Sequence, residues 1–127
     1  MTTNPTGTTG PDFVSFQVRD LAASARFYEE VVGLTRLPAP NPQAAVFSRG
    51  GAAFAVRVPL PGVDLDAVGQ LGAGVGVWFH DPDALALHDR LVEQGVAITQ
   101  EPSETPFGTT FSFRDLDGYV VTVHSKA

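Results

Sequence analysis

Two histidines and two aspartates are the residues of this chain best suited to acid-base or metal chemistry. Histidine side chains change charge near neutral pH, so His80 and His124 are candidate general acids, bases or metal ligands, although no third strong ligand has the spacing that a metal site requires. Asp20 and Asp81 form a candidate carboxylate pair. Each follows an alternating apolar run and precedes a helical stretch, where aspartate commonly caps the helix. We therefore predict that both aspartates are helix caps.

Other chemistries lack the residues that they need. The chain has no Cys, which excludes disulfides, thiolate metal sites and cysteine nucleophiles. The glycines of residues 69–76 precede a strand, so they do not form a phosphate-binding loop, and no serine lies in a nucleophile elbow. We expect His88 on the surface of a helix and Asp115 and Asp117 in a turn.

The elements that would position these residues occur twice in the chain. Residues 13–20 and 74–81, offset by 61 positions, are alternating apolar runs that end in aspartate. A period of two predicts a strand with one buried face. A helical stretch follows each run; it ends at Gly33 in the first copy, and in the second it starts at Pro82 and ends at Gly95.

Short strand-like runs follow each predicted helix. A further strand near Arg36 and Leu37 is needed if the first copy is to match the second, and Asp117 with Gly118 predicts a tight turn. The predicted strands cover residues 43–48 and 52–58 in the first copy, and 96–100, 109–114 and 119–124 in the second. Each copy is thus a predicted βαβββ unit.

The chain is the size of one domain. We predict a flexible tail over residues 1–11, rich in Thr, Gly and Pro, and a single domain over 12–127. Within it, repeat one covers 12–58, a linker rich in Gly and Pro covers 59–73, and repeat two covers 74–125.

Composition narrows the classes of partner and the compartment. The 127 residues carry a net charge of −6, with eight scattered Lys and Arg, so we expect no nucleic-acid partner. The apolar runs are shorter than a membrane helix and no signal peptide is evident, so we expect no membrane partner. These features favour a cytoplasmic protein.

Two segments, residues 18–34 and 113–124, resemble the vicinal oxygen chelate superfamily, which includes glyoxalase I, extradiol dioxygenases, fosfomycin-inactivating enzymes and bleomycin-resistance proteins. They contain Phe27 and Tyr28 midway along the first helix, and an Asp-X-Asp-Gly sequence before the last strand. The resemblance implies an α+β fold in which two βαβββ repeats form a curled, half-open, eight-stranded barrel with helices outside. It also implies a homodimer.

In the catalytic branches of that superfamily, a divalent metal is bound by His at the start of the first strand and Glu in the last strand of the repeats. The matching positions here are Phe13, Ala55, Gly74 and Thr122. None of these is a good metal ligand. We therefore expect no metal and no other cofactor.

Strand alternation predicts which side chains line the cavity instead. If Val14, Phe16 and Val18 face the helices, the intervening residues face the cavity. This wall is aromatic, small and sparsely polar, as organic-ligand pockets are. The predicted ligand-binding residues are Phe13, Ser15, Gln17, Arg57, Gly76, Trp78, Thr122 and His124. Core packing is an alternative role for Phe13 and Phe107, and Trp78 is equally suited to a structural or dimer-interface role.

Three functions fit these observations. We favour a non-catalytic protein of the bleomycin-resistance type, a homodimer that confers antibiotic resistance by sequestering a hydrophobic, aromatic or cationic small molecule. The second is a glyoxalase- or dioxygenase-like enzyme, either metal-free or with a metal site built from His80, His124 and Gln17. The third is a component of a larger assembly in which protein fills the cavity. Fold alone does not choose between them.

Overall fold

The computed structural model describes residues 7–38, 41–49 and 51–127. Repeat one begins with β1 (Phe13–Gln17), followed by α1 (Leu21–Arg26), which runs directly into a π-helical segment, η1 (Phe27–Val32). Strands β2 (Ala44–Phe47) and β3 (Ala53–Arg57) complete it. Gly33 adopts a positive φ of 92° and ends the helix at the predicted position.

Repeat two has one strand more after its helix than repeat one has in the described residues. It contains β4 (Val77–His80), α2 (Ala84–Glu93), β5 (Ile98–Thr105), β6 (Gly108–Arg114) and β7 (Val120–His124). The linker between the repeats holds a single 3-10 turn, η2 (Leu65–Ala67). Leu65 and Leu71 are buried, which fastens the linker to the core.

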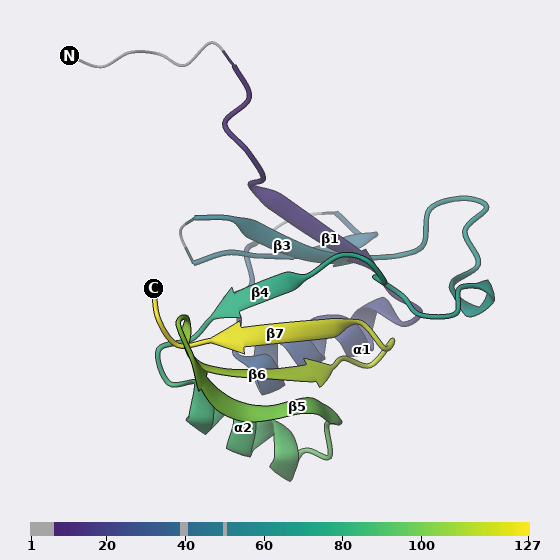
Figure 1. Ribbon diagram of the computed structural model, residues 1–127. Helices are drawn as coiled ribbons and strands as arrows, with labels where there is room; N and C mark the ends of the chain where they lie inside the picture. Colours follow the sequence, from purple (N-terminus) through teal and green to yellow (C-terminus); the bar gives the residue numbers. More distant parts are fainter. Residues whose placement is uncertain (1–6, 39–40, 50) are drawn as a thin grey trace.

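The strands form two sheets with equivalent topology, in the orders β1-β3-β2 and β4-β7-β6-β5. In each sheet the first strand of the repeat pairs in parallel with the last. In the view of Figure 1 both helices lie behind the second sheet, α1 behind β7 and β6 and α2 behind β5. This arrangement confirms the predicted α+β fold built from two repeats.

The predicted count of eight strands is wrong for the described part of the chain. The strand expected near Arg36 is reduced there to a single bridge between Arg36 and Phe47. The two sheets do not close into one barrel, because β1 and β4 pair only within their own sheets. Strand β4 is also shorter than predicted, so Gly74 and Gly76 precede it.

The two predicted helix caps have different outcomes. Asp20 is the N-cap of α1, and its carboxylate accepts a hydrogen bond from the backbone N–H of Ala23. In repeat two the cap is Asp83, which accepts from Ala86. Asp81 instead accepts from the N–H of Asp83, so the prediction for Asp81 was wrong by two residues. Pro82 lies before the helix because of this later start.

A single aromatic core joins the repeats. Tyr28 from η1 packs against Phe54 of repeat one and Phe79 of repeat two, with ring centroids 4.8 and 6.3 Å apart. Phe16 of β1 stacks on Tyr119, just before β7, at 4.1 Å. Burial of such large apolar side chains is the main favourable contribution to folding, and here it requires both repeats.

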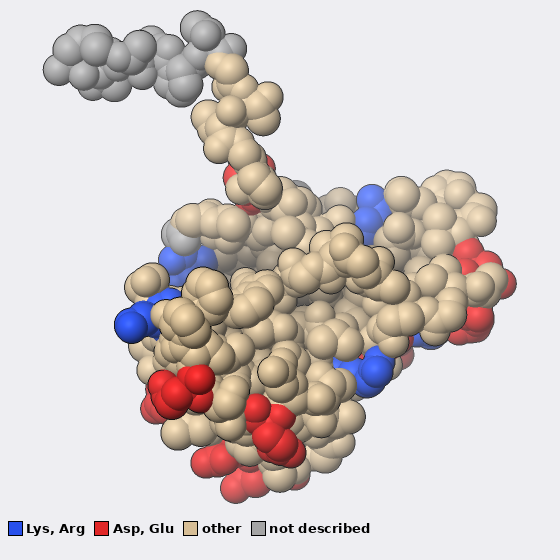
Figure 2. All heavy atoms as spheres, in the orientation of Figure 1, with Lys and Arg blue, Asp and Glu red and all other residues tan. Residues whose placement is uncertain are grey.

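Charge is unevenly distributed over the surface. Acidic side chains gather over the part of the molecule formed by α2 and β5 (Figure 2). None of the helices in residues 7–38, 41–49 and 51–127 has the length and apolar character needed to cross a bilayer. The predicted mobile tail, residues 1–11, falls partly on residues 1–6, which are outside the described residues; residues 7–11 are exposed.

Candidate ligand-binding site

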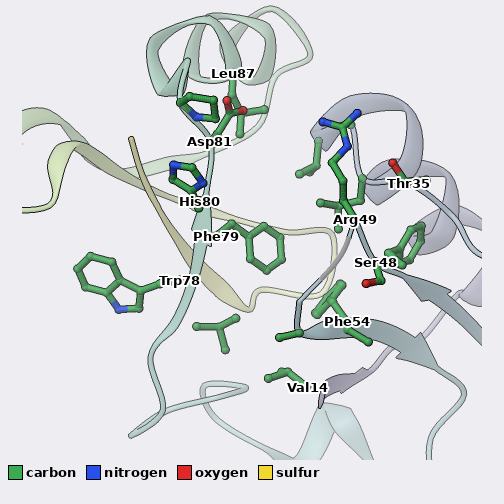
Figure 3. Close-up of a pocket in the computed structure, with 18 residues that line it drawn as sticks. Val14, Thr35, Ser48, Arg49, Phe54, Trp78, Phe79, His80, Asp81 and Leu87 are labelled. Atoms are coloured by element: carbon green, nitrogen blue, oxygen red, sulfur yellow. The ribbon is translucent and has the colours of Figure 1, made fainter. Parts of the chain in front are cut away.

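Most of the predicted repeat-two site residues share one face of the second sheet, which we call the open face. It is the face opposite the apolar core: Val77 and Phe79 of β4 pack against the core, whereas Trp78 and His80 extend to the other side of the strand (Figure 3). Strand register places Trp78 beside Thr122, and Thr122 beside Ser112. The period-two prediction that Trp78, His80 and Thr122 share one face is therefore confirmed, whereas ligand binding at this face stays a prediction.

Aromatic rings form one end of the open face. The indole of Trp78 lies 5.4 Å from the ring of Phe107 in an edge-to-face arrangement and 5.8 Å from the ring of His124. Trp78 and Phe107 nevertheless remain 49% and 55% exposed. A Cβ at Gly76 would lie 3.4 Å from Nε1 of Trp78, an ordinary van der Waals contact, so Gly76 lies against the indole. These rings offer an exposed stacking surface.

A row of polar side chains continues the open face across three strands. Thr122 on β7, Ser112 on β6 and Gln100 on β5 are neighbours in register. The hydroxyl oxygens of Ser112 and Thr122 are 2.8 Å apart, within hydrogen-bonding distance. Ser112 is buried although its side chain is polar, and its hydroxyl also reaches the side-chain oxygen of Gln100 at 3.5 Å. The row can both donate and accept hydrogen bonds.

The two histidines of the open face are neighbours. The ring centroids of His80 and His124 are 5.4 Å apart. Nε2 of His80 lies 3.3 Å from the carbonyl of Ser125, and Nδ1 of His124 lies 2.9 Å from the carbonyl of Lys126. Carbonyls only accept hydrogen bonds, so these nitrogens carry protons and the other nitrogen of each neutral ring is left as an acceptor.

The predicted site residues of repeat one form a separate group on the first sheet. Ser15 is in register with Ala55, and Gln17 with Arg57. The side-chain oxygen of Gln17 accepts a hydrogen bond from Leu60 at 2.8 Å, and the Arg57 guanidinium donates to Val58 at 3.0 Å. The side chains of Gln17 and Arg57, which we predicted would orient a ligand, are therefore hydrogen-bonded to the backbone of the chain.

The three side chains of the hypothetical metal site are not brought together. Gln17 lies beside Tyr119, which precedes β7, because the Tyr119 hydroxyl donates to the Gln17 carbonyl. His80 and His124 lie at the opposite end of β7. Within residues 7–38, 41–49 and 51–127, no three His, Asp or Glu side chains gather closely enough to hold a metal ion.

Several other sequence expectations need correction. Phe13 and Phe107 do not fill the core, since each is more than half exposed. Ala55 is buried although it was expected to face the cavity. His88 is not a surface residue: its side chain is 16% exposed and its ring meets Phe111 edge-on at 5.3 Å.

Sequence reasoning also missed a buried polar cluster, which we call the junction. Asp115, expected simply in a turn, is buried and accepts a hydrogen bond of 2.6 Å from the Tyr28 hydroxyl. Its other carboxylate oxygen accepts from the backbone N–H groups of Asp117, Gly118 and Tyr119. Burial is the main factor that raises the pKa of the Asp115 carboxyl, and it raises the pKa of the Tyr28 hydroxyl well above its usual value.

The neighbouring carboxylate of the junction extends the contact to the β1–α1 turn. Asp117 accepts hydrogen bonds from the backbone N–H and the guanidinium of Arg19, and from the Ser24 hydroxyl. Arg19 also pairs with Asp66 of the linker at 2.7 Å, and this hydrogen bond is the main factor that raises the pKa of the guanidinium. The turn before β7 thus holds repeat one against repeat two.

With this geometry established, comparison with known proteins shows the family. Residues 10–123 match the model of the Glyoxalase/Bleomycin resistance protein/Dioxygenase superfamily. The chain belongs to this superfamily. Comparison with curated protein sequences finds no match.

Solved structures of the superfamily resemble the whole chain. TnmS3, an antibiotic binding protein from Streptomyces sp. CB03234, has a TM-score of 0.74 at 25% identity, over 97% of this chain and 100% of that one. A glyoxalase/bleomycin resistance protein from the same strain has a TM-score of 0.70 at 27% identity, over 91% of this chain and 99% of that one. The fosfomycin resistance protein FosX from Mesorhizobium loti, at 20% identity and a TM-score of 0.67 over 95% of each chain, shares the fold.

Proposed function

We propose that this superfamily member binds a hydrophobic or aromatic small molecule on the open face and acts by sequestering it. The observation that carries this proposal is the exposed ring cluster of Trp78 and Phe107 beside the polar row of Thr122 and Ser112. Aromatic walls with a few convergent polar groups are typical of organic-ligand sites. The similarity to TnmS3, described as an antibiotic binding protein, supports an antibiotic as the ligand class.

The charge distribution favours ligands that carry a positive charge. The net charge is −6, and acidic side chains gather over α2 and β5, in the same repeat as the open face. Such a field attracts cations and repels anions at moderate ionic strength. A cation could also stack on the indole of Trp78.

We further propose that a homodimer covers part of the open faces. Phe13 on the first sheet and Trp78, Phe107 and Val120 on the second are all exposed large apolar residues. Exposed apolar side chains in such numbers commonly mark interfaces. Sedimentation measurements should show a dimer that Phe13→Ser weakens.

The ligand proposal can be tested with the intrinsic fluorescence of Trp78, because it is the single Trp of the chain. Titration with a panel of aromatic antibiotics, cationic and neutral, should quench this fluorescence in a saturable way for at least one compound. Replacement of Trp78 by Ala should lower the affinity for that compound by about tenfold or more, measured by calorimetry. The reason is that a buried aromatic anchor contributes about 1.5–3 kcal/mol to the binding free energy.

A matched control and two outcomes sharpen the experiment. Leu85→Ala removes an exposed apolar side chain from α2 and should leave the affinity unchanged. Thr122→Val should lower the affinity for polar ligands severalfold, because the polar row of the open face loses a hydroxyl. A panel with no saturable binder, or equal affinity for wild type and Trp78→Ala, would refute binding at the open face.

A further inference from the structure

A concave region lies between the repeats, on the helix side of β1 and β4. This cleft has a volume of about 490 Å³. Apolar side chains from both repeats line its walls: Val14, Leu34, Phe47, Phe54, Val77, Phe79 and Leu87. Phe79 points into the cleft, whereas the side chains of Trp78 and His80 extend away from it on the other side of β4 (Figure 3). The cleft therefore lies on the opposite side of β4 from the indole of Trp78, although Trp78 and His80 both border it.

The cleft follows from the way in which the two sheets meet. Strand β1 pairs with β3 and strand β4 pairs with β7, but β1 and β4 do not pair with each other. The junction holds the Gln17 end of β1 against Tyr119. The cleft begins towards the other end of β1, at Val14, where the repeats meet through the rings of Phe54 and Phe79, whose centroids are 5.3 Å apart.

The walls of the cleft are suited to an apolar, flat ligand. Phe47 and Phe54 are buried, whereas Phe79, Val14 and Val77 keep part of their surface exposed to the cleft. Removing such apolar surface from water is favourable by about 25 cal/mol per Å². A volume of 490 Å³ also lies within the range of roughly 300–1,000 Å³ that is typical of small-molecule sites.

The rim of the cleft carries a cation, Arg49, and a carboxylate, Asp81, on opposite sides. Arg49 is exposed and has neither an ion-pair nor a hydrogen-bond partner in the part of the chain that the structure describes. Thr35 and Ser48 lie beside it on the same rim, joined by the hydrogen bond from Ser48 N–H to the Thr35 carbonyl. Across the cleft, Asp81 accepts a hydrogen bond from Asp83 at the start of α2, where the helix dipole offsets its charge.

We propose that the cleft is a binding site for organic anions with an apolar, aromatic body. The body lies against Phe79, Val14 and Val77, which keep part of their surface exposed to the cleft, and the carboxylate pairs with Arg49 at the rim. A guanidinium matches a carboxylate with two parallel hydrogen bonds, and the Thr35 and Ser48 hydroxyls can donate further ones. This site prefers the charge opposite to that proposed for the open face and does not depend on it.

A pair of probes with the same shape tests the assignment: naphthalene carboxylate and its uncharged carboxamide. Methyl NMR spectra of the full chain report both sites at once. Titration with the carboxylate should shift the methyl resonances of Val14, Leu34 and Leu87 in a saturable way and leave Thr122 unchanged. Arg49→Gln should lower the affinity for the carboxylate about tenfold and the affinity for the carboxamide by less than twofold. Arg26→Gln, the same change on exposed α1, should affect neither probe.

A second variant tests the walls rather than the rim. Val77→Phe fills part of the cleft and should lower the affinity for both probes at least tenfold. Val92→Phe, at an exposed position on α2, should leave both affinities unchanged. Three results would overturn the proposal. The methyl resonances of the cleft could fail to shift, or only the Thr122 resonance could shift. Alternatively, Arg49→Gln could weaken the binding of both probes equally. Cleft shifts that depend on protein concentration without any probe would assign the cleft to a second copy of the chain instead.

Discussion

The two repeats differ most at the turn that precedes their last strand. In repeat two this turn carries Asp115 and Asp117, which bind Tyr28, Ser24 and Arg19 of repeat one. In repeat one the corresponding sequence is Ser48, Arg49 and two glycines. Ser48 and Arg49 have no contact of this kind with repeat two and instead lie at the rim of the cleft.

This contrast shows how one topology can produce a closed contact and an open one. Both sheets have the same strand order, so the topology alone would make the two turns equivalent. The carboxylates of the repeat-two turn accept hydrogen bonds from donors on repeat one and so close that end. The repeat-one turn supplies a cation and a hydroxyl, and the structure pairs neither side chain with repeat two.

The largest expected effect comes from removal of the buried carboxylate at the closed end. Asp115→Ala leaves the backbone N–H groups of Asp117 and Tyr119 and the Tyr28 hydroxyl without their acceptor, whereas the Gly118 N–H keeps its bond to the carbonyl of residue 115. Unsatisfied buried donors of this number should lower the free energy of unfolding by about 3 kcal/mol, measured by urea denaturation.

Leu116→Ala is the matched control, because it truncates an exposed side chain in the same turn. It should change the free energy of unfolding by no more than about 0.5 kcal/mol. If Asp115→Ala changed the free energy of unfolding as little as Leu116→Ala, the junction would not be what holds the repeats together. The two turns would then not differ in the stability that they provide.

Replacement of Tyr28 by Phe removes one donor of the junction and should lower the free energy of unfolding by about 2 kcal/mol near pH 7. Burial raises the pKa of the Tyr28 hydroxyl in the folded chain well above its ordinary value. The unfolded chain therefore loses this proton first, so the stabilisation is complete below pH ~10 and is lost as pH rises further.

The pH dependence distinguishes the hydrogen bond from simple packing. The difference in unfolding free energy between wild type and Tyr28→Phe should narrow by about 1.4 kcal/mol for each pH unit above 10. Urea denaturation at two alkaline pH values measures this slope. A difference that is constant with pH would mean that the phenol of Tyr28 does not titrate differently in the folded and unfolded chains.

A smaller effect is expected from Ser24, whose buried hydroxyl donates to Asp117 at 3.2 Å. Ser24→Ala should lower the free energy of unfolding by about 1 kcal/mol, because Asp117 keeps its bonds to Arg19. Ser103→Ala, at an exposed position on β5, should have no measurable effect in the same denaturation experiment. If Ser24→Ala and Ser103→Ala changed the free energy of unfolding equally, the hydrogen bond from Ser24 to Asp117 would not contribute to the junction.

Local rules in the sequence succeeded where one element alone decides the outcome. Gly33 ends its helix as predicted because a positive φ is a property of that residue and its turn. Asp20 caps α1, whereas Asp81 does not cap α2, because Asp83 provides an equivalent side chain two residues later. A local signal that occurs twice within three residues cannot locate the helix start by itself.

The sequence by itself determined the duplicated βα pattern, the alternation of side chains along β4 and the absence of usual metal ligands at Phe13, Ala55, Gly74 and Thr122. These features depend on residue type and on the fixed alternation of side chains along a strand. Only the tertiary structure decided that Asp115 is buried against Tyr28, 87 positions away, and that Arg49 borders a cleft. Both depend on how two separate sheets pack, and contacts between distant segments leave no periodic signal in a single sequence.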